Sequence, residues 1–148
     1  MIDSSLEQVL EKDGFIISPI KGTSMTPLLK ENVDRVVIKK LEKTIKKGDV
    51  LLYKRPNGAY ILHRVYKATP NFLVMCGDNH LTLEYNVKYE AVLGVLTGVY
   101  KQDKFIDLEK SFKYKIYKNF YGNNRFIRLC AFKIRNAKIK LMKLFKKG

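Results

Sequence analysis

The 148-residue chain has few of the residues that build disulfide or metal frameworks. Its only cysteines, Cys76 and Cys130, give neither a disulfide framework nor a metal-ligand spacing. Its only histidines are His63 and His80, so we expect no zinc site, no other metal and no cofactor. Two reduced thiols are typical of a cytoplasmic protein.

Long apolar runs are missing as well. The longest nearly apolar stretch, residues 91–100, is interrupted by glycine and threonine, and a spanning helix needs about 20 apolar residues. Residues 1–14 contain acids and lack the apolar centre of a signal peptide. We therefore expect neither a membrane span nor an export leader.

Acidic residues are absent from the last quarter of the chain. Residues 111–148 hold 12 lysines and arginines and no acid, and they carry most of the formal net charge of +15. Residues 1–110 hold 17 basic and 14 acidic side chains and are close to neutral. This asymmetry divides the chain into a globular body, residues 1–110, and a basic tail, residues 111–148.

The body is predicted to be mainly β. A short helix over residues 3–13 comes first, with a capping box between Ser4 and Glu7. Short apolar and β-branched runs then alternate with turns, of which Pro56-Asn57-Gly58 is the clearest hairpin signal. These features favour a compact antiparallel β-barrel or coiled sheet of six or seven strands. The expected strands are residues 15–20, 33–39, 50–53, 60–66, 72–75, 92–100 and 105–106.

Three stretches of the body supply the groups of an activated serine nucleophile. Ser24 lies in a turn between a glycine and a proline, where its side chain can project outward. The period of two in a strand places His63 on one face with Ile61 and Val65. Asp78 follows in a Gly-Asp-Asn turn. In chain order these are a nucleophile, a general base and a group that orients the base.

Each of these residues also has an ordinary structural interpretation. Ser24 can belong to a surface turn, and Asp78 to a turn in which Gly-Asp-Asn is favoured chemistry. His63 can be a half-buried strand residue with one structural hydrogen bond. His80, one residue past the Gly-Asp-Asn motif, is interpreted as incidental.

Four motifs recur in order over about residues 20–100: Gly22-Thr23-Ser24-Met25-Thr26-Pro27, Gly48-Asp49-Val50, Leu62-His63-Arg64-Val65 and Gly77-Asp78-Asn79. This set resembles the signal peptidase I clan of serine peptidases, which includes the LexA-like self-cleaving repressors. The resemblance implies an antiparallel β-barrel or coiled sheet of that type, closed by the strand at 92–100, with Ser24 as nucleophile. Histidine at position 63 is similar to the endoplasmic-reticulum, archaeal and sporulation-type branch, whereas bacterial signal peptidases have lysine there.

The resemblance also implies the remaining parts of the site. Asp78 is the expected partner that orients His63, and Glu84 is the alternative, because it stands where the histidine-type branch often has an aspartate. The backbone N–H of Ser24 is the expected first oxyanion donor. Gram-negative relatives add a serine two residues earlier, where this chain has Gly22, so a second donor has to come from backbone or a neighbouring group.

The choice of His63 as the general base predicts how the activity depends on pH. An imidazole near its unperturbed pKa of about 6.5 is neutral at pH 7 and accepts a proton, so activity should rise with pH through the histidine range. A profile that keeps rising to pH 9 would instead indicate a lysine base such as Lys21 or Lys39.

Two functions remain open from the sequence. The first is a serine endopeptidase, soluble or peripherally attached to the inner membrane face, that cuts a peptide or protein precursor in extended form. The second is a catalytically inactive barrel that binds an anionic membrane or nucleic acid through its basic tail. Nucleic acid is disfavoured because no recognised module is present. We expect neither the membrane anchor of signal peptidases nor the DNA-binding domain of LexA-like repressors, so the resemblance leaves the substrate open.

The tail is predicted to end in a basic amphipathic helix over residues 125–147, whereas residues 111–121 fit both helix and strand spacing. Ile127, Ile134 and Leu141 fall on one face of this helix and most basic residues on the other. Such a helix can lie on an anionic membrane, or it can pack its apolar face on the body with its charges solvated. The candidate membrane-binding side chains are Lys133, Arg135, Lys138, Lys140, Lys143, Lys146 and Lys147.

Overall fold

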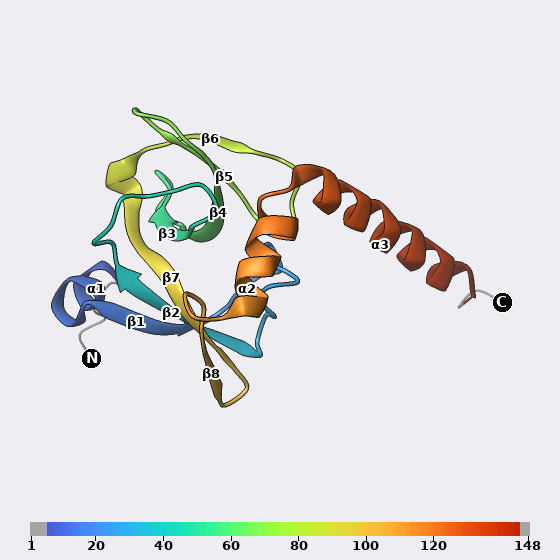
Figure 1. The fold of residues 1–148 in the computed structure, drawn as a ribbon, viewed down its shortest axis with the longest axis horizontal. Coiled ribbons are helices and arrows are strands. Elements are labelled where there is room, and N and C mark those ends of the chain that lie inside the picture. Colours follow the sequence, from blue (N-terminus) through green and yellow to red (C-terminus); the bar gives the residue numbers. More distant parts are fainter. Residues whose placement is uncertain (1–5, 146–148) are drawn as a thin grey trace.

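The computed structural model describes residues 6–145, in which eight antiparallel strands form one strongly coiled sheet (Figure 1). The strand order is β1-β2-β7-β3-β4-β5-β6, and β8 pairs with β7. The strands are β1 (Phe15–Pro19), β2 (Asp34–Lys40), β3 (Val50–Lys54), β4 (Tyr60–Ala68), β5 (Leu73–Cys76), β6 (Glu84–Val87), β7 (Val92–Lys101) and β8 (Lys104–Asp107). The helices are α1 (Leu6–Asp13), the 3-10 turn η1 (Tyr89–Ala91), α2 (Phe112–Tyr117), the π-helical turn η2 (Lys118–Gly122) and α3 (Arg125–Phe145).

This architecture confirms the mainly β, antiparallel prediction with a helix near each end of the chain. The sheet is open, because its path through the described strands ends at β1 and β6. Strand β6 was not predicted, and the ambiguous segment 111–121 is helical. Ser4 of the expected capping box lies outside the described residues, and the Glu7 carboxylate instead accepts a hydrogen bond from Lys54 Nζ at 2.7 Å.

The predicted hairpin turn joins β3 to β4. Gly58 has φ of +85°, a conformation that glycine adopts without steric cost, and the Asn57 side chain accepts a hydrogen bond from the N–H of Ala59 at 3.1 Å. The resulting register pairs Leu51 with His63 and Tyr53 with Ile61. Side chains of directly paired residues share one face of a sheet, so Tyr53 and His63 lie on the same face.

Strand β3 is buried on both faces and separates two hydrophobic clusters. Val50 and Leu52 pack into the first cluster, whereas Leu51 and Tyr53 pack into the second with Val65. The alternation of a strand explains this division. The second cluster therefore lies on the face of the sheet that carries His63.

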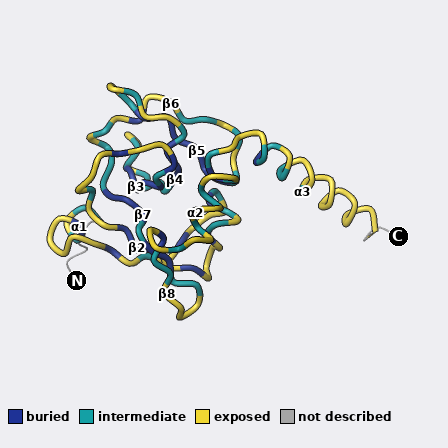
Figure 2. The backbone as a smooth tube through the Cα atoms, in the orientation of Figure 1, coloured by how far each residue is buried: buried dark blue, intermediate teal, exposed yellow. Residues whose placement is uncertain are grey.

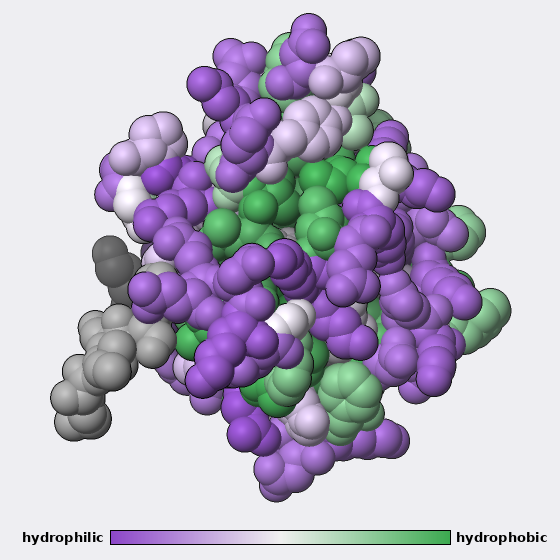
Figure 3. Space-filling model, turned by 90° about the vertical axis from the view of Figure 1, so that its left-hand side faces the viewer, coloured by the Kyte–Doolittle hydropathy of each residue, from purple (hydrophilic) through white to green (hydrophobic). Residues whose placement is uncertain are grey.

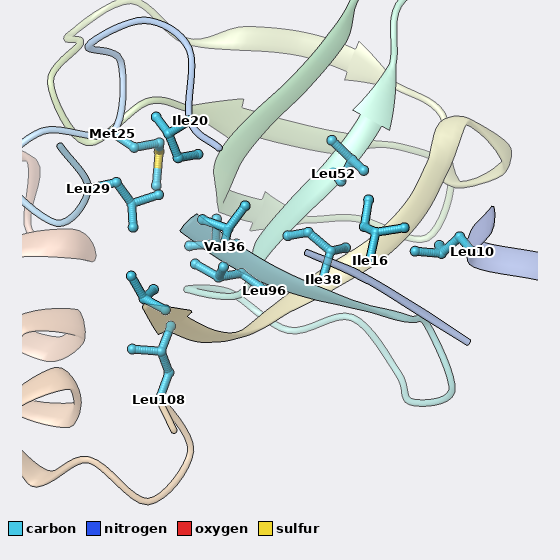
Figure 4. Packing of buried hydrophobic residues seen from close by; sticks show 12 residues of the cluster. Leu10, Ile16, Ile20, Met25, Leu29, Val36, Ile38, Leu52, Leu96 and Leu108 are labelled. Atoms are coloured by element: carbon cyan, nitrogen blue, oxygen red, sulfur yellow. The ribbon is translucent and has the colours of Figure 1, made fainter. Parts of the chain in front are cut away.

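The first cluster fixes the turn that carries Ser24. Met25, which follows it directly, and Leu29 are both buried, and Figure 4 shows them among the side chains of this cluster. The peptide bond between Thr26 and Pro27 is cis. Because its next residue is held in the core, the Ser24 backbone has a defined position at the rim of the sheet.

The C-terminal segment first covers the body and then leaves it. Ser111 caps the N-terminus of helix α2, because its Oγ accepts a hydrogen bond from the N–H of Tyr114 at 3.2 Å. The helix lies beside the sheet (Figure 1). Helix α3 begins after Asn124, whose side-chain oxygen accepts from the N–H of Phe126 and of Ile127. From there α3 projects outward, and residues 136–145 are all exposed (Figure 2).

This course bears on one of the two expectations for the tail, the packing of its apolar face on the body. The outer half of α3 does not pack on the body, so the prediction that the apolar face docks there is wrong for residues 136–145. Within residues 6–145 there is no helix with the length and apolar content to span a membrane.

Candidate active site

Ser24 and His63 line one cavity of about 250 Å³ at the rim of the sheet. Ser24 comes from the turn after β1, and the buried His63 comes from β4. The carbonyl oxygen of Ser24 accepts a hydrogen bond from the N–H of Asn79 at 2.8 Å, which ties the turn to the Gly-Asp-Asn loop. Among the contacts of the described residues, no hydrogen bond joins the Ser24 hydroxyl to His63. In unliganded enzymes such catalytic contacts are often long and tighten only with substrate bound.

Gly77 lets three segments meet at this point. A Cβ atom at position 77 would lie 2.7 Å from the Ser24 carbonyl oxygen, 3.1 Å from His63 Nε2 and 3.2 Å from His80 Nδ1. Any side chain there would push the loop away from the serine or the imidazole. The glycine of the motif is therefore required by close approach, and Nε2 is the His63 nitrogen on the Ser24 side.

The other nitrogen of His63 is held from inside the sheet. Nδ1 lies 3.4 Å from the hydroxyl of Tyr53, and that hydroxyl donates its hydrogen to Glu84 Oε2 at 2.6 Å. A hydroxyl has one hydrogen, so towards His63 the Tyr53 oxygen can only accept. This favours the tautomer with hydrogen on Nδ1, which leaves the Nε2 lone pair free on the Ser24 side.

Glu84 is fixed and ionised by its neighbours. Arg55 donates from Nε to Oε1 at 2.8 Å and from Nη2 to Oε2 at 2.6 Å. The hydrogen bond from Arg55 lowers the pKa of Glu84, with a further contribution from Tyr53. Burial and the Glu84 carboxylate raise the pKa of Tyr53, so its hydroxyl keeps its hydrogen. Glu84 Oε2 itself lies 3.9 Å from His63 Nδ1.

The pKa of His63 is lowered to about 4, mainly by burial and then by the nearby charges of His80 and Arg55, against the opposing charges of Glu84 and Asp78. The imidazole is therefore neutral at pH 7, in the form that accepts a proton. The expectation of an ordinary histidine pKa was too high, because the sequence does not show how deeply β4 buries this side chain.

The Gly-Asp-Asn motif suggested that Asp78 contacts His63, but in the structure Asp78 contacts other residues. Its carboxylate is buried and accepts from Arg64 Nε and Nη2, both at 2.7 Å, and from the Tyr117 hydroxyl at 2.8 Å. It makes no hydrogen bond to His63. Asp78 thus forms a structural ion pair, and of the two candidate acids Glu84 is the one that reaches His63 Nδ1, through the Tyr53 hydroxyl.

Of the two N–H groups considered as oxyanion donors, those of Ser24 and Gly22, only one is free within the described residues. Within residues 6–145 the N–H of Ser24 has no hydrogen-bond partner, so it is free to bind an oxyanion. The N–H of Gly22 donates to Glu31 Oε1 at 2.6 Å. Gly22 therefore does not supply the second donor in this structure.

Two residues of the site, Tyr53 and Arg55, were not singled out from the sequence, and a third, His80, was interpreted as incidental. Tyr53 and Arg55 lie at the end of β3 and just after it, and His80 lines the cavity with its ring edge-to-face to His63, at a centroid distance of 5.8 Å. The pairing of Tyr53 with Ile61 would have placed its side chain on the face of His63. No comparable signal marked Arg55 or His80.

The first turns of α3 hold the Gly-Asp-Asn loop. Arg128 is buried and donates to the carbonyl oxygen of Gly77 at 3.1 Å, and Arg135 donates to the side-chain oxygen of Asn79. Arg135 is therefore a contact of the loop, which corrects its assignment to a membrane-binding face. Of the other candidates on that face, Lys133, Lys138, Lys140 and Lys143 are exposed, and Lys146 and Lys147 lie outside the described residues.

A larger cavity, of about 650 Å³, lies on the other side of the Tyr53–Glu84 contact. It shares Arg55 with the cavity of Ser24 and is bordered by residues of α1, β6 and η1. On the side of the molecule where α1 lies, apolar side chains show between hydrophilic ones (Figure 3). The residues that hold His63, which are Tyr53, Glu84 and Arg55, thus lie between the two cavities.

Known proteins offer no further guide to this site: no family model, curated protein or solved structure matches the chain. Its function has to be argued from the geometry of the site.

Proposed function

We propose that this chain is a serine endopeptidase of the signal peptidase and LexA-like type, with Ser24 as nucleophile and His63 as general base. The proposal rests on the orientation of His63. Its Nδ1 faces Tyr53 and Glu84, and its Nε2 faces the point where Gly77 meets the Ser24 backbone. A neutral imidazole with a free Nε2 beside a serine is the arrangement that nucleophilic catalysis needs.

In acylation, Ser24 Oγ attacks the scissile carbonyl carbon and its proton passes to His63 Nε2. The carbonyl oxygen becomes an oxyanion, for which the free N–H of Ser24 is the donor. The intermediate then collapses, the C–N bond breaks, and Nε2 returns the proton to the leaving amine. The Glu84 carboxylate, connected through Tyr53, stabilises the imidazolium that exists between these two transfers.

In deacylation, a water molecule takes the place of the amine. Its oxygen attacks the ester carbonyl, Nε2 accepts its proton, and the bond between the acyl carbon and Ser24 Oγ breaks with return of the proton to Ser24. The products are a new carboxyl end and a new amino end, with the enzyme unchanged.

The edge of β4 supports an extended peptide as the substrate. Strand β5 pairs with β4 only from Arg64 onward, so Tyr60–His63 has no strand on that side within the described residues. This free edge lines the cavity together with Ile20, Lys21 and Gly22. A peptide that adds there as a strand would carry its backbone past Ser24 and His63.

The test combines labelling and turnover. A fluorophosphonate should modify Ser24, as located by peptide mass analysis, and a peptide library should reveal cleavage by wild type. Ser24→Ala and His63→Gln should each abolish turnover, and the double variant should lose no more than either single one, because the two residues act as a unit. Lys30→Gln, a change at an exposed lysine outside the cavity, serves as the control and should retain activity.

Turnover that survives Ser24→Ala would contradict the proposal. Clearly additive losses in the double variant would also argue against a shared mechanism. A folded wild-type protein with neither labelling nor turnover would favour the alternative function, a catalytically inactive body that acts as a binding module.

A further inference from the structure

Helix α3 carries along its length a stripe of large apolar side chains that face solvent. Phe126, Ile134, Leu141 and Phe145 are 73%, 70%, 57% and 79% exposed. Their spacing of eight, seven and four residues places them on one face of a helix, with Ala137 between them. At 1.5 Å per residue the stripe is about 30 Å long. Such an area of exposed apolar surface marks an interaction site rather than scattered surface residues.

A different face of α3 makes its contacts with the body. Arg128, Phe132 and Arg135 border a small pocket with residues 78–81. At 100° per residue this face lies roughly opposite the apolar stripe. The helix can therefore keep its contacts with the loop while the stripe is covered by a partner.

Lysines border the stripe on both sides. Lys133 and Lys140 lie along one border and Lys138 along the other, and all three are exposed. The chain has no acidic residue from position 111 to its end. An apolar strip edged by lysines fits the boundary between lipid headgroups and acyl chains, where long lysine stems keep the ammonium groups in water.

We propose that α3 binds in the plane of an anionic phospholipid surface, with this stripe inserted and the lysines among the headgroups. A second copy of the chain fits less well, because pairing two stripes would bring rows of lysines together with no acid on either helix. Nucleic acid would neutralise the lysines but leave the apolar side chains in water.

Docking in this way would bring the candidate active site to the membrane. Arg128 and Arg135 of the same helix hold Gly77 and Asn79, and Asn79 in turn binds the backbone of Ser24. If the proposed peptidase function is correct, the favoured substrates are peptide segments presented at a bilayer surface. This last step rests on that function, whereas lipid binding does not.

The direct test is sedimentation with vesicles of phosphatidylglycerol and phosphatidylcholine, compared with vesicles of phosphatidylcholine alone. Full-length protein should bind the anionic vesicles and release them as salt is raised. Lys138→Gln/Lys140→Gln should lower partitioning about 25-fold, since each lysine near the surface contributes about a factor of five. The control Lys67→Gln/Lys104→Gln changes the net charge equally at exposed lysines of β4 and β8 and should bind as wild type.

Insertion of the stripe can be seen separately from charge. Ile134→Ser/Leu141→Ser should weaken binding at least tenfold without lowering the melting temperature, because both side chains are already exposed in the free protein. The chain contains no tryptophan, so Phe145→Trp gives a single reporter whose fluorescence should shift to the blue on anionic vesicles. The control reporter Phe105→Trp, on β8, should not shift.

Several results would overturn this inference. These are no vesicle binding at low salt, equal binding to neutral vesicles, and a dimer in solution that Ile134→Ser/Leu141→Ser disrupts while vesicles stay unbound. Cleavage assays test the further step. The variant Ile134→Ser/Leu141→Ser should cut a soluble peptide like wild type but lose the preference for a lipid-anchored peptide. Absence of cleavage with vesicle binding intact would refute the peptidase function and leave the lipid surface standing.

Discussion

The hydroxyl of Tyr53 lies 3.4 Å from Nδ1 of His63, on the side of the imidazole away from Ser24. Because this hydroxyl donates to Glu84, it is an acceptor for His63 and favours the tautomer that a general base needs. A tyrosine thus stands between the histidine and the carboxylate. This arrangement differs from the simpler one in which Asp78 contacts the histidine directly.

Tyr53→Phe should lower kcat about five- to tenfold, which corresponds to the loss of one hydrogen bond of about 1 kcal/mol. KM should change little, because the hydroxyl faces away from the cavity. Steady-state kinetics on a peptide substrate measure both. Tyr85→Phe, at an exposed position of β6, is the matched control, and an equal effect there would refute the role of Tyr53.

Glu84→Gln should reduce kcat roughly 10- to 100-fold, because it removes the charge that supports the imidazolium. Asp78→Asn should change the activity per folded molecule less than threefold. The comparison needs active protein to be quantified by Ser24 labelling at a temperature where both variants are folded. The reverse order of effects would restore Asp78 as the orienting residue.

The pH profile of kcat/KM should rise through an apparent pKa of about 4 and be flat by pH 6, because burial stabilises neutral His63. The same shift acts on stability. The unfolded histidine titrates near 6.5, so between pH 4 and 6.5 the unfolded chain binds more protons and the free energy of unfolding increases with pH. A half-maximum near 6.5 would mean a solvated His63, and a profile still rising at pH 9 would indicate a lysine base, for which Lys21 lines the cavity.

Asp78→Asn and Arg64→Met should each destabilise the protein by about 3–5 kcal/mol, because each leaves a buried charge without its partner. The double variant should be less destabilised than the sum of the two. Tyr117→Phe should cost about 1 kcal/mol, since Asp78 keeps both bonds from Arg64. Urea denaturation measures all four, and additive single effects would contradict a coupled pair.

The sequence predicted the parts of the fold that local patterns control. Alternation in β4 placed His63 on the face of Ile61 and Val65, and Pro56-Asn57-Gly58 predicted the hairpin. Strand β6, with the sequence Glu-Tyr-Asn-Val, escaped because it has no apolar alternation and is set by pairing with β5. Local patterns identify strands that bury a face, and they miss a mostly exposed strand at the end of a sheet.

The contacts within the site could not be predicted from local patterns, because they join residues that are far apart in the sequence. Glu84 meets Arg55 and Tyr53 across some 30 residues, and no short motif encodes such a contact. The Gly-Asp-Asn motif suggested a catalytic aspartate, yet Arg64 from the histidine motif takes both of its oxygens. The direction of α3 could not be predicted either, because the same apolar stripe suits a helix that packs on the body and a helix that projects away from it.

The Gly-Asp-Asn loop beside Ser24 is held by residues that are synthesised after the loop itself. Asp78 takes a hydrogen bond from a residue 39 positions later, and the Gly77 carbonyl takes one from a residue 51 positions later. On a ribosome, therefore, the strands of the body emerge well before the tyrosine and arginine that complete this loop. A chain still in synthesis would hold Ser24 and His63 without their final support until Tyr117 and Arg128 have emerged, and the proposed cleavage would wait for these two residues.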